Sequence, residues 1–138
     1  MILTGKAWKD GKFWLAEIPA LDLVTQSKRR NQLAGMLRDA VRTLSSENSL
    51  DLSVALHTDG HIWVQSRDCT ELLALVLRRQ RQKHGLTLRE AAARLGSKSP
   101  NAYARYENSQ VTPSLAKLVE LLSAIDPSGV LRIDWAPK

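Results

Sequence analysis

The sequence predicts an α+β fold in two parts: a small antiparallel sheet with one covering helix over residues 1–67, and an all-α bundle ending in a short strand over residues 68–138. Two observations support this prediction. In the first part, short runs that alternate apolar and polar residues surround one amphipathic helical stretch, and two Asp-Gly pairs mark turns. From about Asp68 onward, the apolar residues recur at helical spacing instead.

The first 67 residues predict the order β-β-β-α-β-β. The runs ILTGKAW and FWLAEI flank Asp10-Gly11, and Asp-Gly favours a tight hairpin turn because both central residues take positive φ. LDLVTQS predicts a third short strand, and LDLSVAL and HIWVQS form a second hairpin around Asp59-Gly60. Between them, one apolar stripe predicts an amphipathic helix: Leu33, Met36, Leu37, Ala40, Val41 and Leu44. A single helix covers one face of this sheet and leaves the other open.

Four short helices follow, each with its own start signal. Thr70 is expected to cap the first, which ends at Gly85. Thr87 and Glu90 have capping-box spacing for the second. The third starts at Ser99-Pro100 with a capping hydroxyl and proline at the first helical position, and the fourth runs from Ser114 to Asp126-Pro127. VLRIDW then alternates again, which predicts a strand.

The third helix, residues 99–108, has small and polar side chains on one face, and it follows a short turn after the second helix. Its apolar residues Ala102, Tyr103 and Tyr106 are expected to face inward, and Asn101, Ala104 and Arg105 outward. Small residues let a helix enter the major groove of DNA, where asparagine pairs with adenine and arginine with guanine. This pattern predicts a helix-turn-helix whose third helix reads DNA.

The charge of the chain is concentrated in the same region. The chain carries a net charge of +6, and residues 78–105 include eight basic side chains but only one acidic side chain, Glu90. Such a local excess favours a surface that binds a polyanion. The basic residues are Arg78, Arg79, Arg81, Lys83, Arg89, Arg94, Lys98 and Arg105.

The segment LRRQRQKHGLTLREAAARLGSKSPNAYARYENSQVTPSLAKLVELLSAI resembles the phage-repressor-like (Xre/Cro) helix-turn-helix family. The resemblance implies DNA contacts by Thr87, Arg89, Lys98, Ser99, Asn101, Ala102, Arg105, Asn108 and Ser114. It also implies a structural ion pair between Arg81 and Glu107, with a DNA contact by Arg81 as the alternative. Two departures stand out: Leu88 replaces the usual glutamine, and the turn at Ser97-Lys98 is one residue longer, which predicts a shifted recognition helix.

The N-terminal half resembles HicB-type antitoxins in KDGKFWLAEIPALDLVTQS and in the helix RRNQLAGMLRDAVRTL. This resemblance implies a cytoplasmic antitoxin that masks a HicA-like RNA-cleaving toxin and represses its own operon on double-stranded DNA. The toxin contacts would come from Trp8, Asp10, Trp14, Glu17, Asp22 and Trp63. At least one of the three tryptophans is expected to be exposed as an interface anchor; the alternative is that all three lie in the core.

A homodimer or a higher even-numbered oligomer is expected because one such module binds DNA too weakly for control, and dimers read two half-sites. The strand after the last helix needs a partner, so its residues Val130, Leu131, Ile133 and Trp135 are the candidate dimer contacts.

The sequence predicts no catalysis, cofactor or metal. His57 and His61 bracket a turn without enough further ligands, Cys69 has no motif partner, and no phosphate-binding glycine motif occurs. No apolar run approaches the roughly 18 residues of a membrane helix, and the alternating N-terminus differs from a signal peptide. Two alternatives to the antitoxin remain: a free-standing regulator whose N-terminal domain senses a ligand or oligomerises, and a decayed RNA-processing enzyme.

Overall fold

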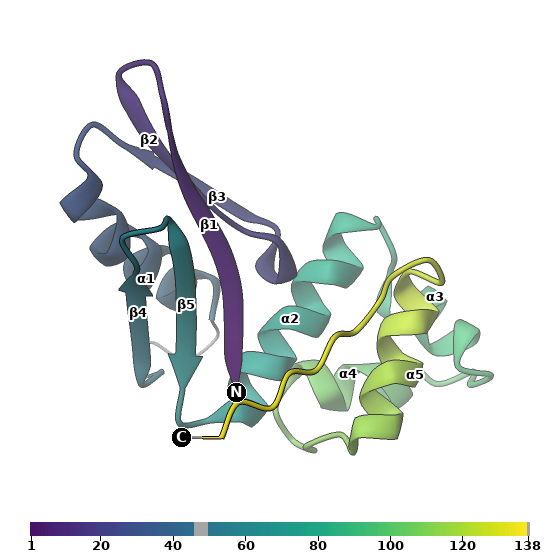
Figure 1. Cartoon of the computed structure of the whole chain (residues 1–138). Helices are drawn as coiled ribbons and strands as arrows, with labels where there is room; N and C mark the ends of the chain where they lie inside the picture. The colour runs from purple at the N-terminus through teal and green to yellow at the C-terminus, as the bar shows by residue number, and fades with distance from the viewer. Residues whose placement is uncertain (46–49, 138) are drawn as a thin grey trace.

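The computed structural model describes residues 1–45 and 50–137. Within them, the N-terminal part is an antiparallel sheet in the order β3-β2-β1-β5-β4. Its strands are β1 (Ile2–Asp10), β2 (Phe13–Ile18), β3 (Leu23–Ser27), β4 (Leu52–Leu56) and β5 (His61–Ser66). One helix, α1 (Leu33–Leu44), lies against a single face of the sheet (Figure 1). The predicted fold class and the β-β-β-α-β-β order are confirmed.

Glycines shape both hairpins and the close approach of two strands. Asp10 pairs with Phe13, so the first turn is Gly11-Lys12, and Gly11 has a φ of 58°. The prediction that both central residues take positive φ is wrong, because a hairpin turn with glycine first needs it only there. In β1, a Cβ on Gly5 would lie 2.3 Å from the carbonyl oxygen of Glu17, so only glycine fits at this position.

The C-terminal part contains the four predicted helices, α2 (Cys69–Lys83), α3 (Leu88–Arg94), α4 (Asn101–Glu107) and α5 (Leu115–Ile125). The capping box at Thr87 and Glu90 forms with both reciprocal hydrogen bonds. The expected cap at Thr70 is wrong: the carboxylate of Asp68 accepts the hydrogen bond from the backbone N–H of Glu71, and Thr70 already lies inside α2. Asp68 is an equally good capping residue placed two positions earlier.

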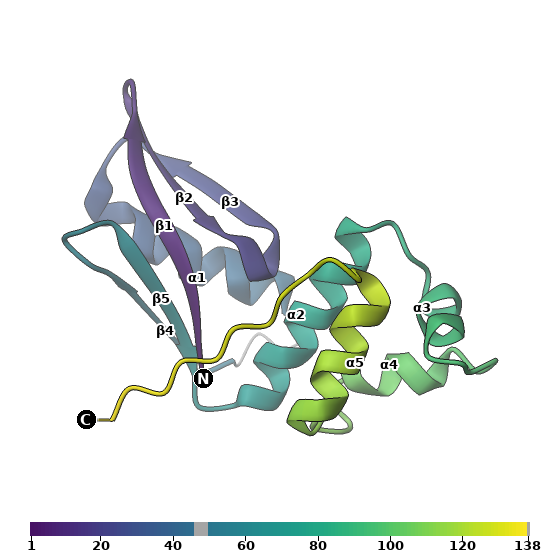
Figure 2. The same cartoon turned by 45° about the vertical axis from the view of Figure 1, so that its right-hand side comes forward.

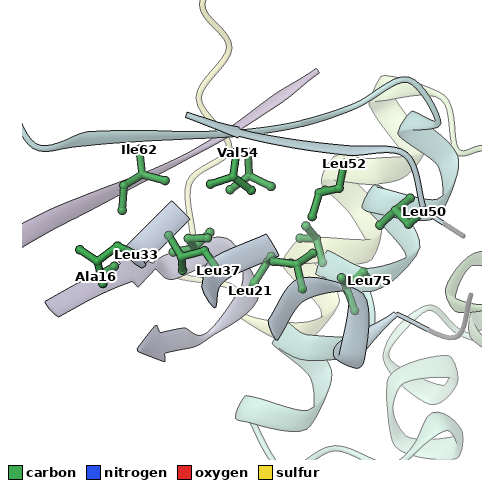
Figure 3. Close-up of a cluster of buried hydrophobic side chains, with 13 residues drawn as sticks. Ala16, Leu21, Leu33, Leu37, Leu50, Leu52, Val54, Ile62 and Leu75 are labelled. Carbon is green, nitrogen blue, oxygen red and sulfur yellow. The ribbon is translucent and has the colours of Figure 1, made fainter. Parts of the chain in front are cut away.

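Each of the two parts has its own core of buried apolar side chains, and α2 contributes residues to both cores. The first lies between the sheet and α1 and includes Leu75 and Val76 of α2 (Figure 3). The second lies among α2–α5 and includes Leu77, the next residue of α2. The boundary predicted between residues 67 and 68 therefore falls just before a helix that is packed into both cores.

Polar contacts fix α2 to one corner of the sheet. That corner is the short helix η1 (Pro19–Leu21) between β2 and β3. The side chain of Gln80 donates hydrogen bonds to the carbonyl oxygens of Pro19 and Ala20, and Arg79 donates to that of Leu21. The carbonyl oxygen of Pro19 also accepts from the backbone N–H of Asp22, which closes the turn. The helical part is therefore held against the sheet by both apolar and polar contacts.

The predicted strand at VLRIDW is not formed. Residues 126–137 contain no helix or strand, although Figures 1 and 2 show them running extended from the end of α5 past α2 to the start of β1. A strand needs a hydrogen-bonding neighbour, and among the described residues no backbone group pairs with residues 130–135. In the described part of the chain, no helix is long and apolar enough to cross a membrane.

Candidate nucleic-acid interface

The turn between α3 and α4 sets the position of the expected recognition helix. Gly96 takes a φ of 81° after α3, and the N–H of Ser97 donates to the carbonyl oxygen of Ala92, which ends the helix. The expected start of α4 is wrong in detail. Pro100 occupies the N-cap position, and Ser99 contributes its carbonyl oxygen, which accepts from the N–H of Ala102, rather than its hydroxyl.

The α4 helix presents a narrow polar face, as predicted. Tyr103 and Tyr106 are 0% and 5% exposed and pack into the second core. Asn101 and Arg105 are exposed, and Ala104 between them adds no bulk. Ala102, which appeared among the DNA-contacting residues, is half-buried and packs against the core. The surface available to a DNA groove is therefore centred on Asn101, Ala104 and Arg105.

The side chain of Arg105 is oriented by its neighbour. Its guanidinium carbon lies 5.1 Å from the ring centroid of Tyr106, and a guanidinium nitrogen donates to the Tyr106 hydroxyl at 3.3 Å. Because Tyr106 is itself buried, the arginine is held on the surface of α4 in a restricted set of conformations. This restraint reduces the side-chain entropy that Arg105 would lose in the expected contact with a base or a phosphate.

Four of the eight basic side chains between residues 78 and 105 form hydrogen bonds or an ion pair within the protein. Arg78 donates to the carbonyl oxygen of Leu44, Arg79 to that of Leu21, and Arg94 to those of Ala124 and Ile125 at the end of α5. Arg81 is paired with Glu107. The other four basic residues, Lys83, Arg89, Lys98 and Arg105, are exposed, and Lys83 lies 3.8 Å from a carboxylate oxygen of Asp22. The excess charge seen in the sequence thus overstates the charge that is available to a polyanion.

Arg81 and Glu107 form the ion pair that the resemblance implies. The Nε of Arg81 lies 2.6 Å from Oε1 of Glu107, and a second guanidinium nitrogen lies 3.0 Å from Oε2. The hydrogen bond that Arg81 donates to Glu107 raises the pKa of Arg81. Burial, reinforced by the charge of Glu107, raises the pKa of Tyr103 well above its usual value. The pair joins α2 to the end of α4 and so fixes the recognition helix.

The remaining expected DNA contacts lie at the ends of helices. Thr87 and Ser114 use their hydroxyl oxygens to accept from backbone N–H groups at the starts of α3 and α5. Asn108 is exposed at the end of α4, and Arg89 is exposed in the first turn of α3. Helix N-termini attract phosphates, which agrees with backbone contacts on either side of α4.

The uncovered face of the sheet carries part of the expected toxin site. Trp8 and Trp63 are 41% and 45% exposed there, which confirms that at least one tryptophan is exposed, and Glu17 lies on the same face. Trp14 points to the opposite face, where it packs against the core beneath Arg30. Asp10 ends β1, and Asp22 lies 3.8 Å from the Nζ of Lys83. The structure therefore places Trp8, Glu17 and Trp63 on one face of the sheet, whereas Trp14 lies on the opposite face and Asp22 lies beside α2.

A polar link between the two parts was not anticipated. Glu71 is 5% exposed at the start of α2. It accepts hydrogen bonds from the hydroxyls of Ser45 at the end of α1 and Ser109 just after α4. An acidic residue in a first helical turn is common, so nothing in the sequence distinguished this one. In the described ranges, no group of three or more His, Cys, Asp and Glu side chains is placed to hold a metal ion.

Comparisons with known proteins agree with this geometry. A helix-turn-helix family model matches residues 77–127, which span the end of α2 through α5. No curated protein and no solved structure is significantly similar to the chain. The match covers the pairing of α3 and α4, the Arg81–Glu107 pair and the exposed face of α4. Residues 77–127 are therefore a helix-turn-helix module of the Xre type, and the chain is a sequence-specific DNA-binding regulator.

Proposed function

We propose that this protein is an antitoxin that represses its own operon through α4 and neutralises a HicA-like, RNA-cleaving toxin through its sheet. The observation that supports the DNA half most directly is the strip formed by the exposed Asn101 and Arg105 and the small, half-buried Ala104 above two buried tyrosines. A dimer binds two half-sites about one helical turn apart. Such a repressor acts in the cytoplasm, where its operon lies.

The DNA-binding part is tested by selecting preferred duplexes from a random pool and then measuring two variants on the selected and on random DNA. Arg105→Ala should cost roughly 1 to 3 kcal/mol on the selected site and relax the preference at one base pair. Lys98→Ala should weaken binding to all sequences alike and lower the salt slope by about 1. If the two variants behave identically on both kinds of DNA, α4 does not read bases in the proposed way.

Support for the toxin half comes from the uncovered sheet face. Two large aromatic side chains, Trp8 and Trp63, remain about half exposed on the same face of the sheet as Glu17. Aromatic residues anchor protein interfaces, and a carboxylate suits a basic RNA-cleaving partner.

Co-purification of the protein with the product of the neighbouring gene tests this half. Trp63→Ala should weaken the complex at least about tenfold, as expected for a central interface anchor. Met36→Ala is the matched control, because Met36 is an exposed apolar residue on α1, on the other side of the sheet. If no protein from that operon binds while selected DNA does, the chain acts as a free-standing regulator, which is the alternative function.

A further inference from the structure

The C-terminal segment 130–135 has the form of a strand without a partner. Val130, Ile133 and Trp135 are 80%, 67% and 86% exposed. Within the described residues, no backbone hydrogen bond joins the segment to the rest of the chain. An extended apolar segment with open N–H and C=O groups is a template for pairing with another strand.

An apolar groove lies beneath this segment. It has a volume of about 810 Å³ and runs between the segment, α2, α5 and the start of β1. Its walls include Ile2, Leu115 and Val119, which are 43%, 56% and 45% exposed. Contiguous apolar surface of this kind marks an interaction site.

We propose that residues 130–136 pair antiparallel with the same residues of a second copy, with the two-fold axis at Ile133. This inference specifies the dimer of the proposed function and rests on it. In this register Ile133 lies opposite itself, Leu131 opposite Trp135, and Arg132 opposite Asp134. Each Arg–Asp contact occurs twice, and opposite charges in cross-strand pairs are stabilising.

The neighbouring registers are less favourable for reasons visible in the sequence. A shift by one residue places charged side chains opposite apolar ones, because side chains alternate between the faces. A shift by two places Arg132 opposite Arg132, or Asp134 opposite Asp134, and like charges directly opposite are destabilising. In the proposed register Leu131, Ile133 and Trp135 of both copies share one face. On that face, Leu131 and Ile133 line the groove, and pairing would cover the exposed Trp135 with Leu131 of the second copy.

Charge reversal in the full-length protein tests the register. Arg132→Asp places acids opposite acids, and Asp134→Arg places arginines opposite arginines, so each single variant should dimerise roughly tenfold more weakly. An equimolar mixture of the two, and the doubly reversed variant, regain complementary pairs and should dimerise like the unchanged protein. Lys12→Asp, at the exposed β1–β2 turn, is the control for a charge change of the same size. Analytical ultracentrifugation of differently labelled chains measures each dissociation constant.

Disulfide trapping gives an independent readout, with the exposed Cys69 first replaced by serine. Paired Ile133→Cys residues would have Cα atoms roughly 4.5 to 5.5 Å apart, within reach of a disulfide. Arg132→Cys residues would lie about 8 Å apart and should not link. A dimer that resists both charge reversals and never links at position 133 overturns the register but leaves the proposed dimer standing. A protein that stays monomeric while repressing normally overturns both.

Discussion

Replacement of Glu107 by alanine should lower the free energy of unfolding by about 3 to 5 kcal/mol, the usual cost of leaving one partner of a buried ion pair alone. The structure places this pair at the upper end of burial, since the side chains of Arg81 and Glu107 are 13% and 5% exposed. Without the carboxylate, the guanidinium keeps a hydrogen bond to the carbonyl oxygen of Leu86 but loses both contacts of 2.6 and 3.0 Å.

Urea denaturation followed by circular dichroism measures this loss, and a double-mutant cycle isolates the pair. Arg81→Met should be costly by a similar amount, whereas Arg81→Met combined with Glu107→Leu should recover most of the stability, because apolar side chains then fill the site without a buried charge. The reasoning is refuted if Glu107→Ala costs less than about 1 kcal/mol. If Arg81→Met instead weakens DNA binding with no loss of stability, Arg81 is a DNA contact.

Two further pairs of measurements test the packing. Gly5→Ala should destabilise the sheet by several kcal/mol, because the added Cβ would lie 2.3 Å from the carbonyl oxygen of Glu17. Gly35→Ala should stabilise the protein by about 0.5 to 1 kcal/mol, because Gly35 lies in α1 with open space around it. Equal melting temperatures for the two variants would contradict both expectations. Tyr103→Phe should change the dependence of stability on pH: because burial raises the pKa of Tyr103 above the usual 10.0, its contribution is intact below pH 10 and falls as the pH rises further. The phenylalanine variant should lose less stability between pH 10 and 11, and identical pH profiles for the two proteins would contradict the assignment.

Local signals predicted most of the fold. The alternation in β1, β2, β4 and β5 and the stripe on α1 are properties of neighbouring residues, so they could be read directly. The capping box at Thr87 and Glu90 was equally local. The cap of α2 is Asp68 instead of the predicted Thr70; both residue types cap helices and they stand two positions apart, so residue type alone does not identify the cap.

Long-range contacts limited the reading of the site. Arg78 and Arg94 looked like part of a DNA-binding cluster, yet they donate to the carbonyl oxygens of Leu44 and Ala124, which are distant in sequence. The pairing of Arg81 with Glu107 was available only through the family resemblance. The strand expected at residues 130–135 is not formed because a long-range contact is missing. The segment does alternate apolar and polar residues, but a strand forms only when it is hydrogen-bonded to a neighbouring strand.

The two cores share α2, and this has a thermodynamic consequence for regulation. Residues 75–77 pass from one core directly to the other, so neither half can melt without exposing part of the other's apolar surface. A ligand that selects the native form at one end therefore protects both ends against heat, and operator DNA should slow proteolysis of the sheet. Because both cores include α2, DNA bound to the helical part should be detectable as greater stability of the sheet, without any change in the structure of the sheet.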